Sequence, residues 1–200
     1  MNKVITISRE YGAGGHTIGQ KVAEELGIPF SDNDILRETA KASGFELELV
    51  EQEGEDVSPA VSILKGICSV SSMTYNDTQE AIREVQQAII LRFAHEGPCV
   101  ILGRCADEVL RSAGVDCLNV FIHADAVHRA LRVSELTGVT DPSELEKMLV
   151  KKDKSRHNYY RHYTGKHWGD SHNYHMSLDS GALSTDLCVE MIVKAAQAED

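Results

Sequence analysis

Apolar and polar positions follow two rhythms along the chain: short apolar runs, and longer segments in which apolar residues recur every three or four positions. Short apolar runs bounded by turn residues predict buried strands, and the helical recurrence predicts amphipathic helices. The predicted strands are residues 4–7, 28–30, 99–102, 117–122 and 175–178. The predicted helices are residues 17–26, 33–42, 78–95, 106–112, 125–136 and 184–198, with a long polar helix that opens at Pro142.

Apolar strands separated by helices are typical of a parallel sheet with both faces covered, which predicts an α/β fold. Ligands of such folds bind beyond the carboxyl ends of the strands. The prediction therefore places the 8–17 loop, Asp32, Arg104 and the 122–125 turn along one edge of the sheet. No repeat or linker divides the 200 residues, which predicts one compact domain.

Two segments lack a clear pattern of either kind. Residues 44–77 combine an acidic stretch with mixed serine and apolar residues, and we expect a helical, partly mobile insertion there. Residues 159–170 have little apolar periodicity and are predicted to form a surface loop.

Charge and cysteine content exclude several classes of protein. The formal net charge is -11 and no long basic run is present, unlike proteins that bind nucleic-acid polymers through many phosphate contacts. The first apolar run is too short for a signal peptide or a membrane span. The five cysteines are odd in number and widely spaced, which argues against a disulfide framework and favours the cytoplasm.

The opening of the chain carries the most informative motif: a buried strand, a glycine-rich loop and the first turn of a helix. Glycines let backbone N–H groups converge on an anion, and the N-terminus of the helix adds partial positive charge. This order predicts a phosphate-binding loop and hence a nucleotide. The alternative is a glycine-rich turn that binds no ligand.

The loop departs from the Walker A pattern G-x-x-x-x-G-K-[ST]. With Gly15 aligned to its last glycine, His16 stands at the lysine position, Thr17 at the serine/threonine position and Glu10 at the first glycine. The Thr17 hydroxyl is a candidate magnesium ligand. A histidine brings charge to a phosphate only when it is protonated, which is partial near neutral pH. Arg9 is a candidate substitute cation.

Polar residues follow two of the other predicted strands. Arg104 comes directly after a buried strand, where a guanidinium facing the ligand crevice can bind a phosphate through two hydrogen bonds. The alternative is a capping or surface arginine. Asp32 and Asp34 follow the second strand and are candidates to bind or orient an acceptor, although Asp32 can equally cap the next helix.

Basic residues concentrate after the fourth predicted strand. Arg129 and Arg132 share one helix face, and Asp153 and Arg156 lie in a stretch rich in lysine. A mobile, positively charged segment suits phosphoryl transfer, which needs charge neutralisation and exclusion of water. The alternative is a solvated helix face whose lysines pair with neighbouring glutamates.

Histidines and aromatic residues gather between residues 157 and 175. The histidines lack the spacing and the cysteine partners of a zinc site, and we expect exposed loop histidines. The tyrosines and Trp168 either stack on a base or pack the loop against the core, and both alternatives stay open at this point.

Seven segments together resemble a known family: ISREYGAGG (7–15), GIPFSD (27–32), VILGR (100–104), RALR (129–132), DKSR (153–156), YTGKHWGD (163–170) and LDSGAL (178–183). They are similar to those of the cytidylate kinase-like proteins, relatives of bacterial cytidylate kinase among the P-loop nucleoside monophosphate (NMP) kinases. The resemblance implies the three-layer sandwich of P-loop NTPases, with a five-stranded parallel sheet. It implies a core at residues 1–30, 78–137 and 171–200, an NMP-binding insertion at 31–77 and a lid at 138–170.

The resemblance also implies transfer of the γ-phosphate of ATP to an NMP such as CMP or dCMP, with Mg²⁺ as the second cofactor. The donor phosphates would bind, with Arg9 nearby, to the loop residues Gly12, Ala13, Gly14, Gly15, His16 and Thr17. Arg104 and Arg156 would bind the acceptor and transferring phosphates, with Asp32 and Asp153 as further candidate substrate-binding residues.

The remaining candidate catalytic residues are Arg129 and Arg132, from the base of the lid, and His16. His16 replaces the Walker lysine, and Cys105 follows Arg104 where cytidylate kinases have an aspartate. Two alternatives therefore stand beside the leading hypothesis: a kinase of another small-molecule acceptor, and a weakly active, nucleotide-binding regulatory protein. The expected partners are ATP and a small, NMP-like acceptor, with no nucleic-acid polymer and no membrane; the sequence leaves the oligomeric state open.

Overall fold

The computed structural model describes residues 4–47, 50 and 75–198. Its strands form one parallel sheet in the order β2-β3-β1-β4-β5. The strands are β1 (Val4–Arg9), β2 (Phe30–Ser31), β3 (Val100–Leu102), β4 (Cys117–His123) and β5 (Met176–Asp179). The predicted α/β fold with a five-stranded parallel sheet is confirmed.

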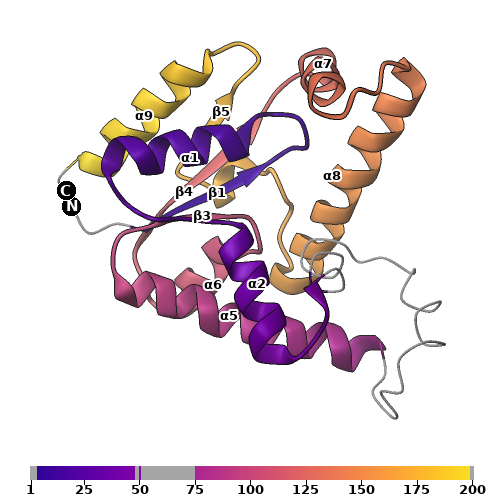
Figure 1. The fold of residues 1–200 in the computed structure, drawn as a ribbon. Coiled ribbons are helices and arrows are strands. Elements are labelled where there is room, and N and C mark those ends of the chain that lie inside the picture. The colour runs from indigo at the N-terminus through magenta and orange to yellow at the C-terminus, as the bar shows by residue number, and fades with distance from the viewer. Residues whose placement is uncertain (1–3, 48–49, 51–74, 199–200) are drawn as a thin grey trace.

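Helices cover both faces of this sheet and make a three-layer molecule (Figure 1). The helices are α1 (Gly15–Leu26), α2 (Asn33–Ser43), α5 (Tyr75–Glu96), α6 (Ala106–Ser112), α7 (Ala126–Thr137), α8 (Pro142–Thr164) and α9 (Thr185–Gln197), with a short 3-10 helix at Ser171–Asn173. α1 and α9 lie on one face, and α5 and α6 lie on the other. None of these helices is long and apolar enough to cross a membrane.

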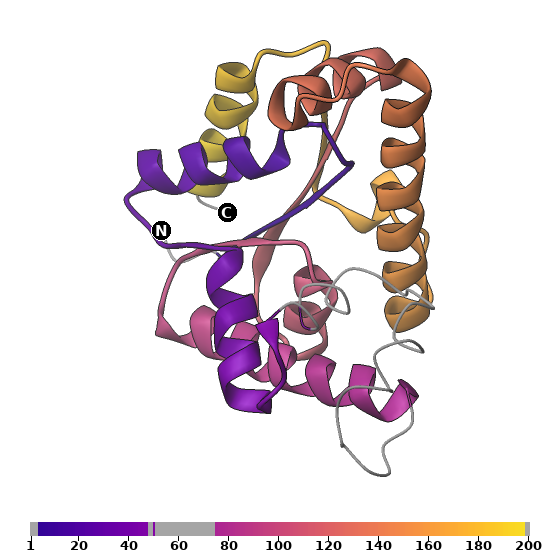
Figure 2. The ribbon, with the colours of Figure 1, turned by 45° about the vertical axis from the view of Figure 1, so that its right-hand side comes forward.

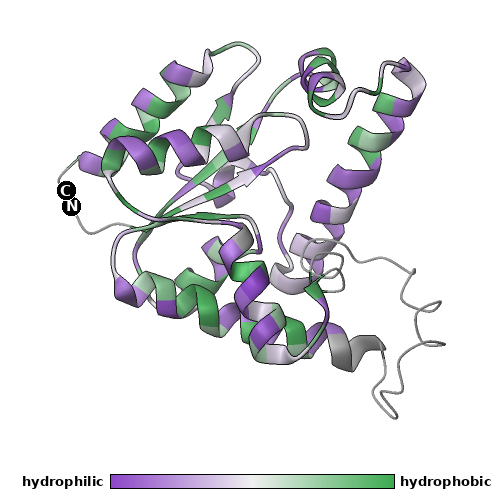
Figure 3. Ribbon diagram, viewed as in Figure 1, coloured by the Kyte–Doolittle hydropathy of each residue, from purple (hydrophilic) through white to green (hydrophobic). Residues whose placement is uncertain are grey.

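Two hydrophobic cores fill the spaces between the layers. Ile5 and Ile7 of β1 pack with Ile18 of α1 and Ile192 of α9. Ile101 of β3 belongs to the opposite core, under α5 and α6. Successive strand side chains point to opposite faces, so a strand that is apolar throughout supplies both cores. Figure 3 shows the hydrophobic residues on the strands and on the helix surfaces that face them.

Several predicted boundaries near the loop are wrong, and β1 ends at Arg9 instead of Ile7. The second strand is Phe30–Ser31 and not 28–30, because Pro29 has no N–H and contributes only its carbonyl oxygen, 2.9 Å from Val100 N. α1 begins at Gly15, two residues before the predicted start at Thr17. Most of the insertion predicted at 44–77 lies outside the described residues.

The predicted surface loop at 159–170 is wrong in its first part, because α8 continues as a helix to Thr164. Tyr159 and Tyr160 are buried and pack on Cys105. The guanidinium of Arg83, on α5, lies 3.8 Å above the ring of Tyr163. Aromatic side chains therefore form the inward face of this part of α8. Figure 2 shows α8 as one long helix running from α7 toward the α5 side of the sheet.

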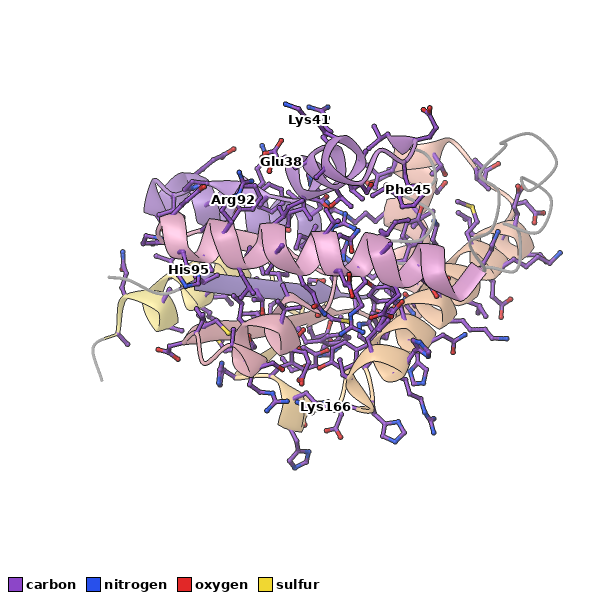
Figure 4. All side chains as sticks on the ribbon, turned by 90° about the horizontal axis from the view of Figure 1, so that it is seen from below. Glu38, Lys41, Phe45, Arg92, His95 and Lys166 are labelled. Carbon is purple, nitrogen blue, oxygen red and sulfur yellow. The ribbon has the colours of Figure 1, made fainter. Side chains whose placement is uncertain are left out.

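Polar contacts join the elements on the α5 face. Arg92 of α5 pairs with Glu38 of α2, and Figure 4 shows their side chains close together. Lys166, just after α8, forms a 2.9 Å ion pair with Glu108 of α6. The division into core, insertion and lid remains a prediction.

Candidate functional site

The glycine-rich loop between β1 and α1 is tightly folded against α7. Gly12 and Gly14 have φ angles of 82° and 79°, in the left-handed region that favours glycine. A Cβ atom on Gly12 would lie only 2.7 Å from the carbonyl oxygen of Arg129. The carbonyl oxygen of Ala13 accepts a 2.6 Å hydrogen bond from the Ser180 hydroxyl, which fixes the middle of the loop to the end of β5. Ser180 has no role in the sequence prediction.

The start of α1 has no side-chain cap. Its N-cap residue is Gly14, which makes no side-chain cap, and its first turn has no acidic residue. The positive end of the helix dipole and the first N–H groups are therefore available to a phosphate. Phosphate binding by the loop from Gly12 to Thr17 remains a prediction.

His16, Asp32 and Arg104 are brought together at the carboxyl edge of the sheet, as the sequence predicts. The His16 Nε2 atom is 3.6 Å from Asp32 Oδ2, and Arg104 Nη2 donates to Asp32 Oδ1 at 3.3 Å. The His16 ring also meets Phe30 edge-on, with 5.2 Å between centroids. Asp32 stands at the N-cap of α2 without making a side-chain cap, and its carboxylate contacts His16 and Arg104 instead of the helix end.

Arg104 is held in the crevice by an unusual backbone. Gly103, Arg104 and Cys105 have φ angles of 72°, 58° and 52°, three left-handed residues in succession. Non-glycine residues adopt this conformation at a cost of about 1 kcal/mol or more each, and such residues gather at functional sites. The Arg104 side chain is 4% exposed, and its buried Nε has no hydrogen-bond partner among the described residues. The surface alternative for Arg104 is therefore wrong.

A pocket lies between Arg104 and α8. It is lined by Ser8, Arg9, Gly103, Arg104, Cys105, Arg156, Tyr159, Tyr160 and Trp168. Three arginines beside three aromatic rings suit an anionic group. The sequence analysis did not name Ser8, Cys105, Tyr159 or Tyr160 as site residues, and it left open whether the tyrosines bind a ligand or pack on the core. The helical spacing of the tyrosines with Arg156 is the signal that could have revealed two of them.

Arg129 is neutralised by two carboxylates that also hold the loop. It pairs with Asp153 of α8, and its Nε lies 3.4 Å from Glu10 Oε2. The other oxygen of Asp153 accepts a 2.8 Å hydrogen bond from the backbone N–H of Tyr11. Glu10 accepts from Ala124 N at 3.2 Å. We call Glu10, Arg129 and Asp153 the loop clamp, because they fasten the first half of the loop to α7 and α8.

Arg132 and Arg156 approach the loop from different helices. Arg132, one turn after Arg129 on α7, donates from Nη2 to Thr17 Oγ1 at 2.8 Å. Arg156 of α8 donates from Nη1 to the carbonyl oxygen of Arg9 at 3.1 Å and also lines the pocket. The Arg156 guanidinium lies 5.9 Å from the centroid of the Tyr11 ring. The four predicted arginines thus reach one site, but their contacts differ.

The pocket wall rests on a buried carboxyl group. Asp107 is 5% exposed and accepts a 2.7 Å hydrogen bond from the Tyr160 hydroxyl. Burial raises the pKa of Asp107 above its ordinary value, although hydrogen bonds from Tyr160 and the backbone oppose the shift. The neighbouring Glu108 is different: burial raises its pKa, but hydrogen bonds from Arg111 and Lys166 outweigh burial and leave it lowered.

Stability is expected to depend on pH in opposite ways at these two carboxyls. A pKa raised on folding means that Asp107 contributes stability at low pH, which is lost as pH rises through its folded pKa. Asp107→Asn should therefore unfold at a higher temperature than the wild type at pH 7, with the difference vanishing below pH 4. Glu108→Gln should lose stability at pH 7 and match the wild type in acid. Thermal unfolding between pH 3.5 and 8 checks both, and an Asp107→Asn variant that is less stable at pH 7 would contradict the assignment.

The histidines of the 157–175 region lie mostly at the surface. His162, His167, His172 and His175 are exposed, and His157 is partly buried on α8. Among the described residues, no group of three or more histidine, cysteine, aspartate or glutamate side chains could hold a metal ion. The aromatic residues pack inward: Trp168 meets Phe121 edge-on, with 5.3 Å between centroids.

The glycine-rich loop leads into the N-terminus of α1, and a pocket lined by arginines lies beside it at the carboxyl edge of the parallel sheet. This arrangement is that of a P-loop fold of the kinase type. The cytidylate kinase-like family model matches residues 4–182, and the chain belongs to that family. The family indicates a kinase-type phosphotransferase.

Solved structures show the same fold. An uncharacterized protein from Eubacterium ventriosum ATCC 27560 is 27% identical, with a TM-score of 0.73 and coverage of 98% of this chain and 99% of that one. Shikimate kinase from Bacteroides thetaiotaomicron is 14% identical, with a TM-score of 0.58 and coverage of 99% and 100%. A gluconokinase from Sinorhizobium meliloti 1021 is 18% identical, with a TM-score of 0.50 and coverage of 98% and 95%. None of the curated proteins is significantly similar to this chain in sequence.

Proposed function

We propose that the protein transfers the γ-phosphate of ATP to a small anionic acceptor, with an NMP such as CMP or dCMP as the first candidate. The observation that carries this proposal is the placement of the buried, incompletely paired Arg104 beside the N-terminus of α1. A phosphate on the loop and an anion on Arg104 would face each other across Asp32. Such a juxtaposition is what phosphoryl transfer between two bound molecules requires.

The residues divide into a donor side and an acceptor side. Backbone N–H groups from Gly12 to Thr17 would bind the donor phosphates, and the Thr17 hydroxyl would be a ligand of Mg²⁺, which neutralises phosphate charge when bound. Arg104 and Arg156 would hold the anionic group of the acceptor by charge-assisted hydrogen bonds. Tyr159, Tyr160 and Trp168 would shield that group from water and so strengthen these contacts.

A second acceptor class is favoured by Asp32. Its carboxylate lies between the loop residue His16 and the pocket residue Arg104. An NMP attacks with a phosphate oxygen that is already anionic, and a carboxylate at that position would repel it. A hydroxyl acceptor benefits from a carboxylate that accepts its proton, as in protein kinases. The alternative acceptor is therefore a molecule that bears a hydroxyl group and a separate carboxylate or phosphate.

The test is release of ADP from Mg-ATP against two acceptor panels, one of NMPs including CMP and dCMP and one of hydroxy acids and phosphorylated sugars. We expect release above the background ATPase rate with a member of one panel. Activity restricted to the second panel would reject the NMP proposal and support the role of Asp32. ATP binding without release in either panel would instead favour a nucleotide-binding regulatory protein.

A further inference from the structure

We infer that Arg132, and not His16, supplies the positive charge that the missing Walker lysine would bring to the donor phosphates. This inference rests on the proposed ATP site but not on the identity of the acceptor. It assigns different roles to the two α7 arginines, which look equivalent in the sequence.

The position of Arg132 is the first support. A Cβ atom added to Gly14 would lie 3.4 Å from Arg132 Cζ, so the guanidinium covers the loop at the N-cap of α1. Its Nη2 atom reaches Thr17 Oγ1 at 2.8 Å. Gly14 and Thr17 bracket the position where the Walker pattern has its lysine. A side chain from another helix thus occupies the place that a lysine at residue 16 would serve.

The charge of Arg132 is also available, unlike that of Arg129. Arg129 is paired with Asp153 and lies beside Glu10, so its charge is already balanced. Among the described residues, Arg132 forms no ion pair with a carboxylate, and its hydrogen bond goes to a neutral hydroxyl. A half-buried guanidinium without a counter-ion gains strongly from a phosphate, to which it can donate two parallel hydrogen bonds.

His16 is oriented toward a different part of the site. Its side chain is 53% exposed, its ring packs against Phe30, and its Nε2 faces Asp32 at 3.6 Å. Any charge it carries is therefore directed to the carboxylate at the end of β2. The loop can accept a histidine at the lysine position because α7 brings the needed cation.

The experiment measures the affinity of the full chain for Mg-ATP and for inorganic tripolyphosphate by titration calorimetry. Arg132→Gln keeps a polar side chain but removes the charge, and His16→Gln is the parallel change at the loop. Arg111→Gln is the matched control, because Arg111 is an exposed arginine that pairs locally with Glu108. We expect Arg132→Gln to lower the affinity for both ligands by about 10- to 100-fold. His16→Gln and Arg111→Gln should change these affinities by less than about 3-fold, and Arg132→Lys should recover part of the affinity lost in Arg132→Gln.

Several outcomes would overturn the inference. A larger loss in His16→Gln than in Arg132→Gln would return the role to the histidine, and equal losses in Arg132→Gln and Arg111→Gln would show only general attraction. A wild-type protein that binds neither ligand would overturn both the inference and the proposed function. If the affinities follow the expected pattern but no acceptor is phosphorylated, the proposed transfer is rejected and the role of Arg132 is still supported.

Discussion

Arg104→Ala should lower kcat/KM for the acceptor by roughly 10³-fold while leaving the affinity for ATP within a few-fold of the wild type. Arg104 is almost completely buried, has one Nη2 contact with Asp32 and has an unpartnered Nε. These donors act inside a pocket from which water is largely excluded, where each charge-assisted hydrogen bond to an anion is strong. The loop lies on the other side of Asp32, so nucleotide binding does not need this side chain.

Two further variants separate this role from a loss of folding. Arg104→Lys keeps the charge but lacks the planar fork, and it should recover only a small part of the activity. Arg111→Ala removes an exposed arginine and should keep the wild-type kcat/KM. Thermal unfolding of each variant shows whether the pocket survives. An Arg104→Ala protein that folds normally and retains its kcat/KM would exclude Arg104 from the acceptor site.

The sheet and the site edge could be predicted from the sequence because they depend on local patterns. Uninterrupted apolar runs separated by helices indicate buried parallel strands, and the carboxyl ends of parallel strands meet at one edge. Asp32 and Arg104 are far apart in sequence, and in the structure Arg104 Nη2 lies 3.3 Å from Asp32 Oδ1. Within the sheet, the strand ends were misplaced, as at Pro29.

The division of labour among the basic residues could not be predicted, because it depends on which carboxylates the fold brings near them. Arg129 and Arg132 have the same residue type and lie on the same helix face. Asp153, on a different helix, pairs with only one of them. The sequence analysis left the inward packing of Tyr159 and Tyr160 undecided for a related reason. An aromatic helix face has no aliphatic periodicity, and its burial depends on the partner surface at Cys105.

Asp153→Ala should weaken ATP binding by about 10-fold or more and lower the free energy of unfolding by about 2 kcal/mol. The Asp153 carboxylate accepts from the backbone N–H of Tyr11 and pairs with Arg129. Removing it leaves a largely buried arginine next to Glu10 alone and frees the first half of the loop. The entropy of ordering that segment must then be supplied when the nucleotide binds.

Further variants distinguish the role of Asp153 in the loop clamp from direct binding of the substrate, the role that the sequence analysis predicted for it. Asp153→Asn keeps an acceptor for Tyr11 N but loses the charge opposite Arg129. Its affinity for ATP should therefore lie between those of the wild type and Asp153→Ala. Glu146→Gln changes an exposed residue on the same helix and should leave the affinity for ATP and the free energy of unfolding unchanged. In a double-mutant cycle with Arg129→Met, the losses in ATP affinity should be strongly non-additive, because both changes open the same clamp. Additive losses, or a KM effect confined to the acceptor, would place Asp153 on the substrate and not on the loop.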